Sequence, residues 1–92
     1  MAQYRITYWK DIPTLVEAFE GPERVRKTLS ARFQALIDAA AMRQGLTGTE
    51  AYLEAWRMGP VMVREGGPQD VTIAVTAELE ARFEEIRTDA LG

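Results

Sequence analysis

The sequence of 92 residues contains no cysteine and no histidine. Without cysteine there is no disulfide framework and no thiolate chemistry, and without histidine the commonest general base is missing. The two absences together remove nearly all ligands for zinc or iron. The acidic residues between Glu78 and Asp89 do not follow the spacing of a calcium or magnesium loop. We therefore expect a non-enzymatic protein that holds no metal or other cofactor.

Long hydrophobic runs are missing as well. No window approaches the ~18 consecutive apolar residues of a membrane span, and the N-terminal residues do not resemble a secretory signal. The length suits one domain, and an apolar fraction of 47% is ordinary for a globular protein. We expect a single cytoplasmic domain over residues 1–92, with no membrane contact.

Residues 4–13 predict an aromatic β-strand that ends in a turn at Pro13. Because side chains alternate along a strand, one set should pack on the helices, namely Tyr4, Ile6 and Tyr8. The other set should face outward, namely Arg5, Thr7 and Trp9. For Trp9, a place in an interface and a place in the core fit the sequence equally well. Such a strand needs partners in a sheet, so the fold contains further strands.

The sheet is predicted to occupy residues 1–29. Residues 14–19 fit a strand or one side of a short helix, and we favour the strand. Residues 10–13 then connect a hairpin. Residues 20–23 form a second turn that leads into a short strand over residues 24–29.

A helical hairpin is predicted over residues 30–58. Ser30 suits the N-cap of a first helix, which ends at Gly45. Its apolar residues recur at helical spacing: Phe33, Leu36, Ile37 and Ala40. Residues 47–50 fit a capping box that opens a second helix, which Gly59 and the following proline end. Tyr52, Leu53 and Trp56 would share one face of this second helix.

The remaining residues predict a loop or short strand over residues 59–68, followed by one long helix over residues 69–91. Residues 71–76 alternate like a strand, but they also begin a helical stripe made of Val71, Val75, Leu79, Phe83 and Ile86. We favour the helix, with Pro68 in its first turn. The fold class is therefore α+β: a small antiparallel sheet of two or three strands packed on a helical hairpin and a long C-terminal helix.

The net charge is −3, but seven of the eleven basic residues lie in residues 1–45, and nine of the eleven are arginine. Arginine suits multi-donor contacts with carboxylate or phosphate groups. Eight residues make up the candidate partner-binding surface: Arg5, Thr7, Trp9, Lys10, Arg24, Arg26, Lys27 and Arg32. A basic surface with an exposed tryptophan also suits single-stranded nucleic acid. Against nucleic acid stand the net charge and three glutamates close enough in sequence to pair with the arginines: Glu17, Glu20 and Glu23.

Three stretches resemble the small bacterial "virulence factor" domain family: Ile6–Pro13 (ITYWKDIP), Leu29–Arg43 (LSARFQALIDAAAMR) and Thr49–Arg57 (TEAYLEAWR). The motif Tyr-Trp-Lys-Asp-Ile-Pro is the most specific of them. The turn over residues 20–24 is less basic than in other members, which weakens the argument for a positive patch. The family name denotes a phenotype, so the resemblance implies no catalytic residues.

The resemblance also implies a role. Such proteins are associated with gene neighbourhoods of folate- and corrinoid-dependent one-carbon metabolism, which suits an accessory or assembly subunit of a larger bacterial enzyme. We therefore expect a non-catalytic protein-interaction module whose partner is a larger enzyme subunit or a second copy of the chain. The alternative is a nucleic-acid-binding protein that uses the arginine-rich N-terminal surface.

Overall fold

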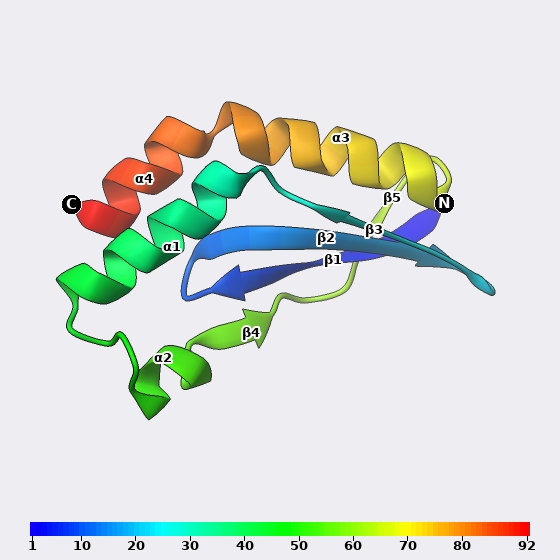
Figure 1. Ribbon diagram of the computed structural model, residues 1–92. Coiled ribbons are helices and arrows are strands. Elements are labelled where there is room, and N and C mark those ends of the chain that lie inside the picture. Colours follow the sequence, from blue (N-terminus) through cyan, green and yellow to red (C-terminus); the bar gives the residue numbers. More distant parts are fainter.

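The computed structural model describes residues 1–92 and confirms the predicted α+β class (Figure 1). Its strands are β1 (Ala2–Trp9), β2 (Ile12–Glu20), β3 (Glu23–Thr28), β4 (Trp56–Met58) and β5 (Met62–Arg64). Its helices are α1 (Ala31–Arg43), α2 (Glu50–Glu54), α3 (Pro68–Ala81) and α4 (Phe83–Leu91). No helix combines the length and the apolar character that crossing a membrane requires.

All neighbouring strands in the sheet are antiparallel, in the order β3-β2-β1-β4. β5 pairs with the beginning of β1, and β4 with its end. The sheet is thus wider than the predicted two or three strands, because β1 also pairs with both short strands of the later chain. The strand predicted over residues 14–19 is confirmed. The hairpin connection is shorter than predicted, since Ile12 already pairs with Trp9 and only Lys10 and Asp11 form the turn.

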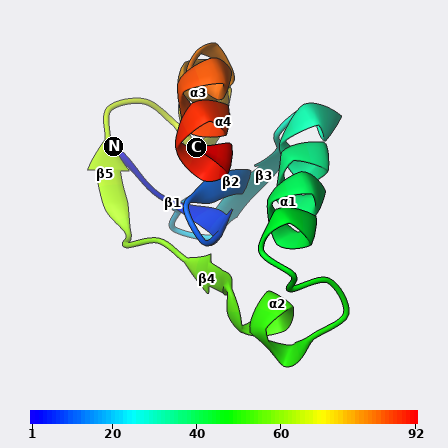
Figure 2. The same ribbon diagram turned by 90° about the vertical axis from the view of Figure 1, so that its left-hand side faces the viewer.

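Helix α3 lies across one face of the sheet and packs against β1, β2 and β3 (Figures 1 and 2). The buried side chains between these layers form the main core: Ile6, Val16 and Ala18 from the sheet, and Val71, Val75 and Leu79 from the helix. Tyr4 and Tyr8 are half-buried against this core, on the same side of β1 as Ile6. The prediction that Tyr4, Ile6 and Tyr8 face the helices is therefore confirmed.

The C-terminal segment is two helices rather than the one helix predicted over residues 69–91. Residues 71–76 are helical, and Pro68 occupies the first turn, as predicted. The helix breaks at Arg82, whose φ of −97° and ψ of 9° leave the helical range. The break lets α4 lie against α1, where the rings of Phe33 and Phe83 meet edge to face with centroids 5.1 Å apart.

The predicted helical hairpin over residues 30–58 is wrong at its second half. α1 forms as predicted, but α2 ends at Glu54, and residues 56–58 are a strand paired with β1. Backbone hydrogen bonds to β1 replace helical hydrogen bonds in residues 56–58. Just before this strand, Ala55 O accepts a hydrogen bond from Lys10 N–H at 2.9 Å. The segment predicted as a loop or short strand over residues 59–68 contains a short strand, β5.

Ser30 occupies the N-cap position of α1, yet its hydroxyl makes no capping bond. Instead, the N–H and the hydroxyl of Ser30 both donate to the carboxylate of Glu80, at 2.7 and 2.8 Å. Arg32 donates to the same carboxylate. These bonds tie the link between β3 and α1 to α3.

Candidate functional site: the open face of the sheet

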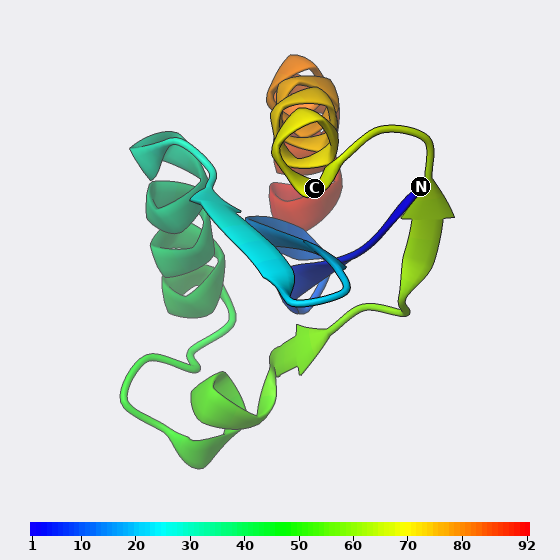
Figure 3. The same cartoon turned by 90° about the vertical axis from the view of Figure 1, so that its right-hand side faces the viewer.

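The sheet face turned away from α3 is the main surface without helical cover, and we call it the open face. Register and alternation assign its residues. Trp9, Ile12 and Trp56 fall on this side as well, but Trp9 and Ile12 are buried and Trp56 packs on Tyr52 of α2. The remaining residues make up the open face: Gln3, Arg5, Thr7, Leu15, Glu17, Phe19, Arg24, Arg26, Thr28, Met58 and Val63. The order of the strands places the arginines over β1 and β3, and the two aliphatic residues Met58 and Val63 at the opposite side of the sheet (Figure 3).

Three arginines surround one glutamate on the open face. Arg5 Nε lies 3.0 Å from Glu17 Oε1. Arg24 Nη1 and Arg26 Nε lie 3.6 and 3.7 Å from Glu17 Oε2. Partial burial by itself would raise the pKa of Glu17, but the hydrogen bond from Arg5 and the three positive charges outweigh it and hold the pKa below its usual value. Three guanidinium groups thus share one carboxylate, so the cluster keeps a net positive charge.

Phe19 lies among these arginines. The guanidinium carbon of Arg5 is 5.9 Å from the centroid of its ring, and that of Arg24 is 5.3 Å from it. Both distances fit cation–π contacts. These contacts hold the long arginine side chains close to the sheet, which lowers the entropy they lose when a partner binds.

Two large apolar side chains on the open face stand in solvent. The exposed fraction is 60% for Met58 and 59% for Val63. Neither was in the predicted surface, because a strand of three residues shows no periodicity and only its pairing with β1 tells which way the side chains point. Only the pairing of these strands with β1 could have assigned Met58 and Val63 to the open face, and the sequence does not show that pairing.

Trp9 was predicted to face outward, and the structure shows it fully buried. Helix α2 covers this end of β1: Trp9 Nε1 donates to Tyr52 O at 2.9 Å, and the two ring centroids are 5.6 Å apart. The predicted exposure of Trp9 is therefore wrong, and its ring is not available for stacking on a base or for contacting a partner. Thr7, two residues earlier, stays half-exposed on the open face.

The other predicted residues lie apart from the arginine cluster. Lys10 is in the β1–β2 turn, where Nζ bonds to Gln44. Lys27 is exposed but alternates onto the helix side of β3. Arg32 Nη2 lies 2.9 Å from Glu80 Oε1 and stacks on Phe83, so it joins helices. The eight predicted residues therefore do not form one surface.

Of the three glutamates expected to pair with the arginines, Glu17 does so, whereas Glu20 Oε2 lies 3.1 Å from the amino group of Met1. The predicted pairing is confirmed for Glu17. Arg5, Thr7, Arg24 and Arg26 remain together on the open face.

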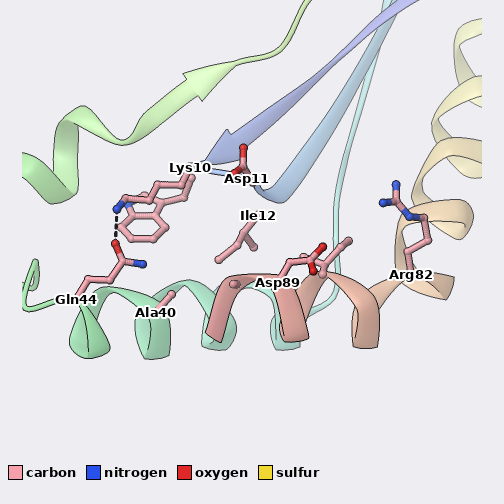
Figure 4. Close-up of a pocket in the computed structure, with 10 residues that line it drawn as sticks. Lys10, Asp11, Ile12, Ala40, Gln44, Arg82 and Asp89 are labelled. Carbon is pink, nitrogen blue, oxygen red and sulfur yellow. Dashed lines mark hydrogen bonds between the residues drawn. The ribbon is translucent and has the colours of Figure 1, made fainter. Parts of the chain in front are cut away.

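A cleft of about 400 Å³ opens between the β1–β2 turn and helices α1 and α4 (Figure 4). Its apolar side chains include Trp9, Ile12 and Ile86, and its charged ones are Lys10, Asp11, Arg82 and Asp89. The cations already have partners, because Lys10 bonds to Gln44 and Arg82 pairs with Glu85. Two positive and two negative side chains line the cleft, so it favours neither an anionic nor a cationic ligand.

The sequence matches the family model described as Virulence factor over residues 7–91. The chain belongs to the Virulence factor family. The match covers the three stretches that carry the resemblance, apart from Ile6, and also the C-terminal helices. No curated protein and no solved structure matched the chain. Because the name Virulence factor states no chemistry, the function of this member has to be argued from its surfaces.

Proposed function

We propose that this member of the Virulence factor family is a non-catalytic protein-interaction module that docks on a larger protein through its open face. The observation that carries the proposal is the exposure of Met58 and Val63 on the same uncovered sheet face as the arginine cluster. Large apolar side chains that stay exposed on an uncovered sheet face are typical of contact sites.

The composition of the open face suits a protein partner. Protein interfaces are enriched in methionine, arginine and aromatic residues and depleted in lysine and aspartate. The open face carries Met58, Phe19 and three arginines. The cluster around Glu17 stays positive, so a complementary partner surface presents carboxylates opposite the arginines and an apolar patch opposite β4 and β5.

The association of such proteins with gene neighbourhoods of one-carbon metabolism suggests what kind of protein the partner is. The partner proposed is a subunit of a larger bacterial enzyme, with this chain as an accessory or assembly subunit. The small size of the chain and the absence of histidine and cysteine are compatible with a role in binding.

Affinity capture at native expression tests the proposal. The chain is tagged, captured from its own cells, and compared with Met58→Glu and Val63→Glu, which place a charge in the apolar part of the open face. Met42→Glu is the matched control, since Met42 is 71% exposed but lies on α1. We expect one enzyme subunit to be captured by the wild type and by the control, and to be lost from both open-face variants.

Two results would contradict the proposal. One is capture of the same partner by all four proteins, which would place the contact elsewhere. The other is a monomer that captures no partner at all.

Nucleic-acid binding remains the second candidate, and the grouping of Arg5, Arg24 and Arg26 is the observation that favours it. It predicts an affinity for oligonucleotides that falls steeply with salt. Titration of the chain with single- and double-stranded oligonucleotides at low salt checks this. Undetectable binding would remove this candidate.

A further inference from the structure

The outer edge of β3 is an unpaired strand edge. β3 is the last strand in the sheet order, and no backbone hydrogen bond from outside the helices and strands reaches residues 23–28. Figure 1 shows that α1 continues beyond the end of β3 rather than beside it. The outward N–H and C=O groups of β3 are therefore open to another strand, a recurring mode of peptide recognition.

Cationic side chains dominate this edge. Arg24 and Arg26 point to the open face, and Lys27 lies on the opposite side of the strand. A second copy of the chain is a poor occupant, because residues 23–28 carry three cations and one anion, so two such edges repel each other. Antiparallel pairing centred on Val25 would match Glu23 with Lys27 but would also place Arg24 opposite Arg26 of the other copy. Like charges directly opposite each other destabilise a strand pair. The charge of the edge instead matches an acidic strand.

An exposed apolar side chain lies above the same edge. Ile73 of α3 is 50% exposed. It lies seven residues, or about two helical turns, before Glu80, so the two share one side of the helix. Glu80 bonds to Ser30, just after β3, which shows that this side of α3 faces β3. A strand added at the edge would therefore have Arg24 and Arg26 on one side, and Ile73, half-buried Val25 and exposed Lys27 on the other.

We propose that the β3 edge binds an extended peptide segment of a partner protein in which acidic and apolar residues alternate. The acidic residues would meet Arg24 and Arg26, and the apolar residues would meet Val25 and Ile73. The segment needs about six residues to match the six residues of β3. This proposal rests on the interaction role proposed above and specifies the chemistry of the partner.

The probe is a capped synthetic octapeptide of alternating glutamate and valine, titrated into the full chain labelled with nitrogen-15. Amide chemical shifts and amide hydrogen exchange are measured by NMR. We expect shifts concentrated in residues 23–28 and slower exchange at alternate amides of this strand, because the peptide backbone occupies them. The affinity should fall as salt rises, since the arginines contribute to it.

Variants distinguish the contribution of the arginines to peptide binding from that of Ile73. Arg24→Glu combined with Arg26→Glu should weaken peptide binding at least about tenfold. Arg43→Glu combined with Arg87→Glu is the matched control on α1 and α4 and should leave binding unchanged. Ile73→Ser changes an exposed helical residue, so it keeps the arginine cluster and the fold while removing the apolar contact. It should weaken binding several-fold.

Three outcomes would overturn the proposal. The first is no amide shift in β3 at millimolar peptide. The second is equal binding of an alternating glutamate–proline peptide, which has the same charge but cannot form the strand bonds. The third is protection of the β3 amides by the protein alone as its concentration rises, which would make a second copy the occupant.

The two proposals fail separately. Met58 and Val63 lie on β4 and β5, on the other side of the sheet from β3. If the peptide does not bind but Met58→Glu still abolishes partner capture, the open face docks a partner without strand addition. If the peptide binds while capture is unaffected by Met58→Glu, the β3 edge is a peptide site and the wider open face is not.

Discussion

Trp9 shows what alternation can and cannot tell at the scale of a single residue. Alternation places its side chain opposite Ile6, which is buried against α3. The side chain is nevertheless buried, because Tyr52, 43 residues later in the chain, lies on it. The local pattern tells on which face of the sheet a side chain lies. Whether the side chain is exposed depends on which distant element packs against that face.

The burial of Trp9 predicts a large stabilising role. Trp9→Ala should lower the free energy of unfolding by about 3–5 kcal/mol, because it leaves a cavity where the ring was. Trp9→Phe should cost about 1–2 kcal/mol, since it keeps most of the ring but removes the N–H that bonds to Tyr52 O. Urea unfolding at neutral pH measures both.

Leu53→Ala is the control for the Trp9 variants, because Leu53 is 67% exposed on α2. Its effect should stay within about 0.5 kcal/mol. If Trp9→Ala destabilised the protein no more than this control, the tryptophan would belong to the surface after all.

At the scale of elements, periodicity predicted where most helices and strands lie, but it did not predict the strand at residues 56–58 or the break in the C-terminal helix. α1 and α3 carry long apolar stripes that local sequence reveals. Residues 56–58 fit the helical pattern of the preceding segment, yet they pair with the edge of β1. A strand of three residues has no periodicity of its own, so the pairing partner decides its conformation.

The segment between β4 and β5 packs closely against β1, so a substitution at Gly59 should lower the stability of the protein. Gly59 N–H donates to Ile6 O at 2.8 Å, so its backbone lies directly against β1. A Cβ at this position would lie 2.9 Å from Tyr8 Cε2 and 3.2 Å from Ile6 O. Gly59→Ala should therefore destabilise the protein by about 1–3 kcal/mol, since the backbone of β1 has to move.

Gly67→Ala is the matched control. No atom lies within 4 Å of a Cβ built at Gly67, and its φ of −80° suits any residue. Thermal unfolding of the two variants should show a lower midpoint for Gly59→Ala alone. Equal midpoints would mean that β4 and β5 do not dock on β1 as closely as the structure shows.

At the scale of the whole molecule, three glutamates join separate elements. Glu17 links β1, β2 and β3 through the arginine cluster. Glu78 of α3 binds Arg64 of β5, and this hydrogen bond lowers the pKa of Glu78. Burial by itself would raise the pKa of Glu80, but the bonds from Ser30 and Arg32 outweigh it and lower the pKa. The layers are thus held together in part by carboxylates.

These pKa shifts predict a loss of stability in acid. The pKa of each glutamate is lower in the folded chain than in the unfolded chain, so the stabilisation is complete above the ordinary value of 4.5. It is lost as the pH falls below 4.5 and through the folded-state values. Urea unfolding at a series of pH values from about 7 to about 3 should show this fall.

A triple variant, Glu17→Gln with Glu78→Gln and Glu80→Gln, should be less stable at neutral pH and should lose much of the acid dependence. The control changes three exposed glutamates that make no ion pair: Glu50, Glu54 and Glu65. This control should keep the acid dependence of the wild type. The same pH profile for wild type and triple variant would mean that other groups govern acid unfolding.

The sequence by itself determined the α+β class, the first hairpin, the third strand and the helices α1 and α3, because each has a periodic pattern that local sequence carries. It also identified the arginines that alternate onto one side of β1 and β3. Only the tertiary structure decided that α2 covers Trp9, that Arg82 divides the C-terminal helix, and that Met58 and Val63 complete the open face. Each of these depends on contacts between residues far apart in the chain, which no local window contains.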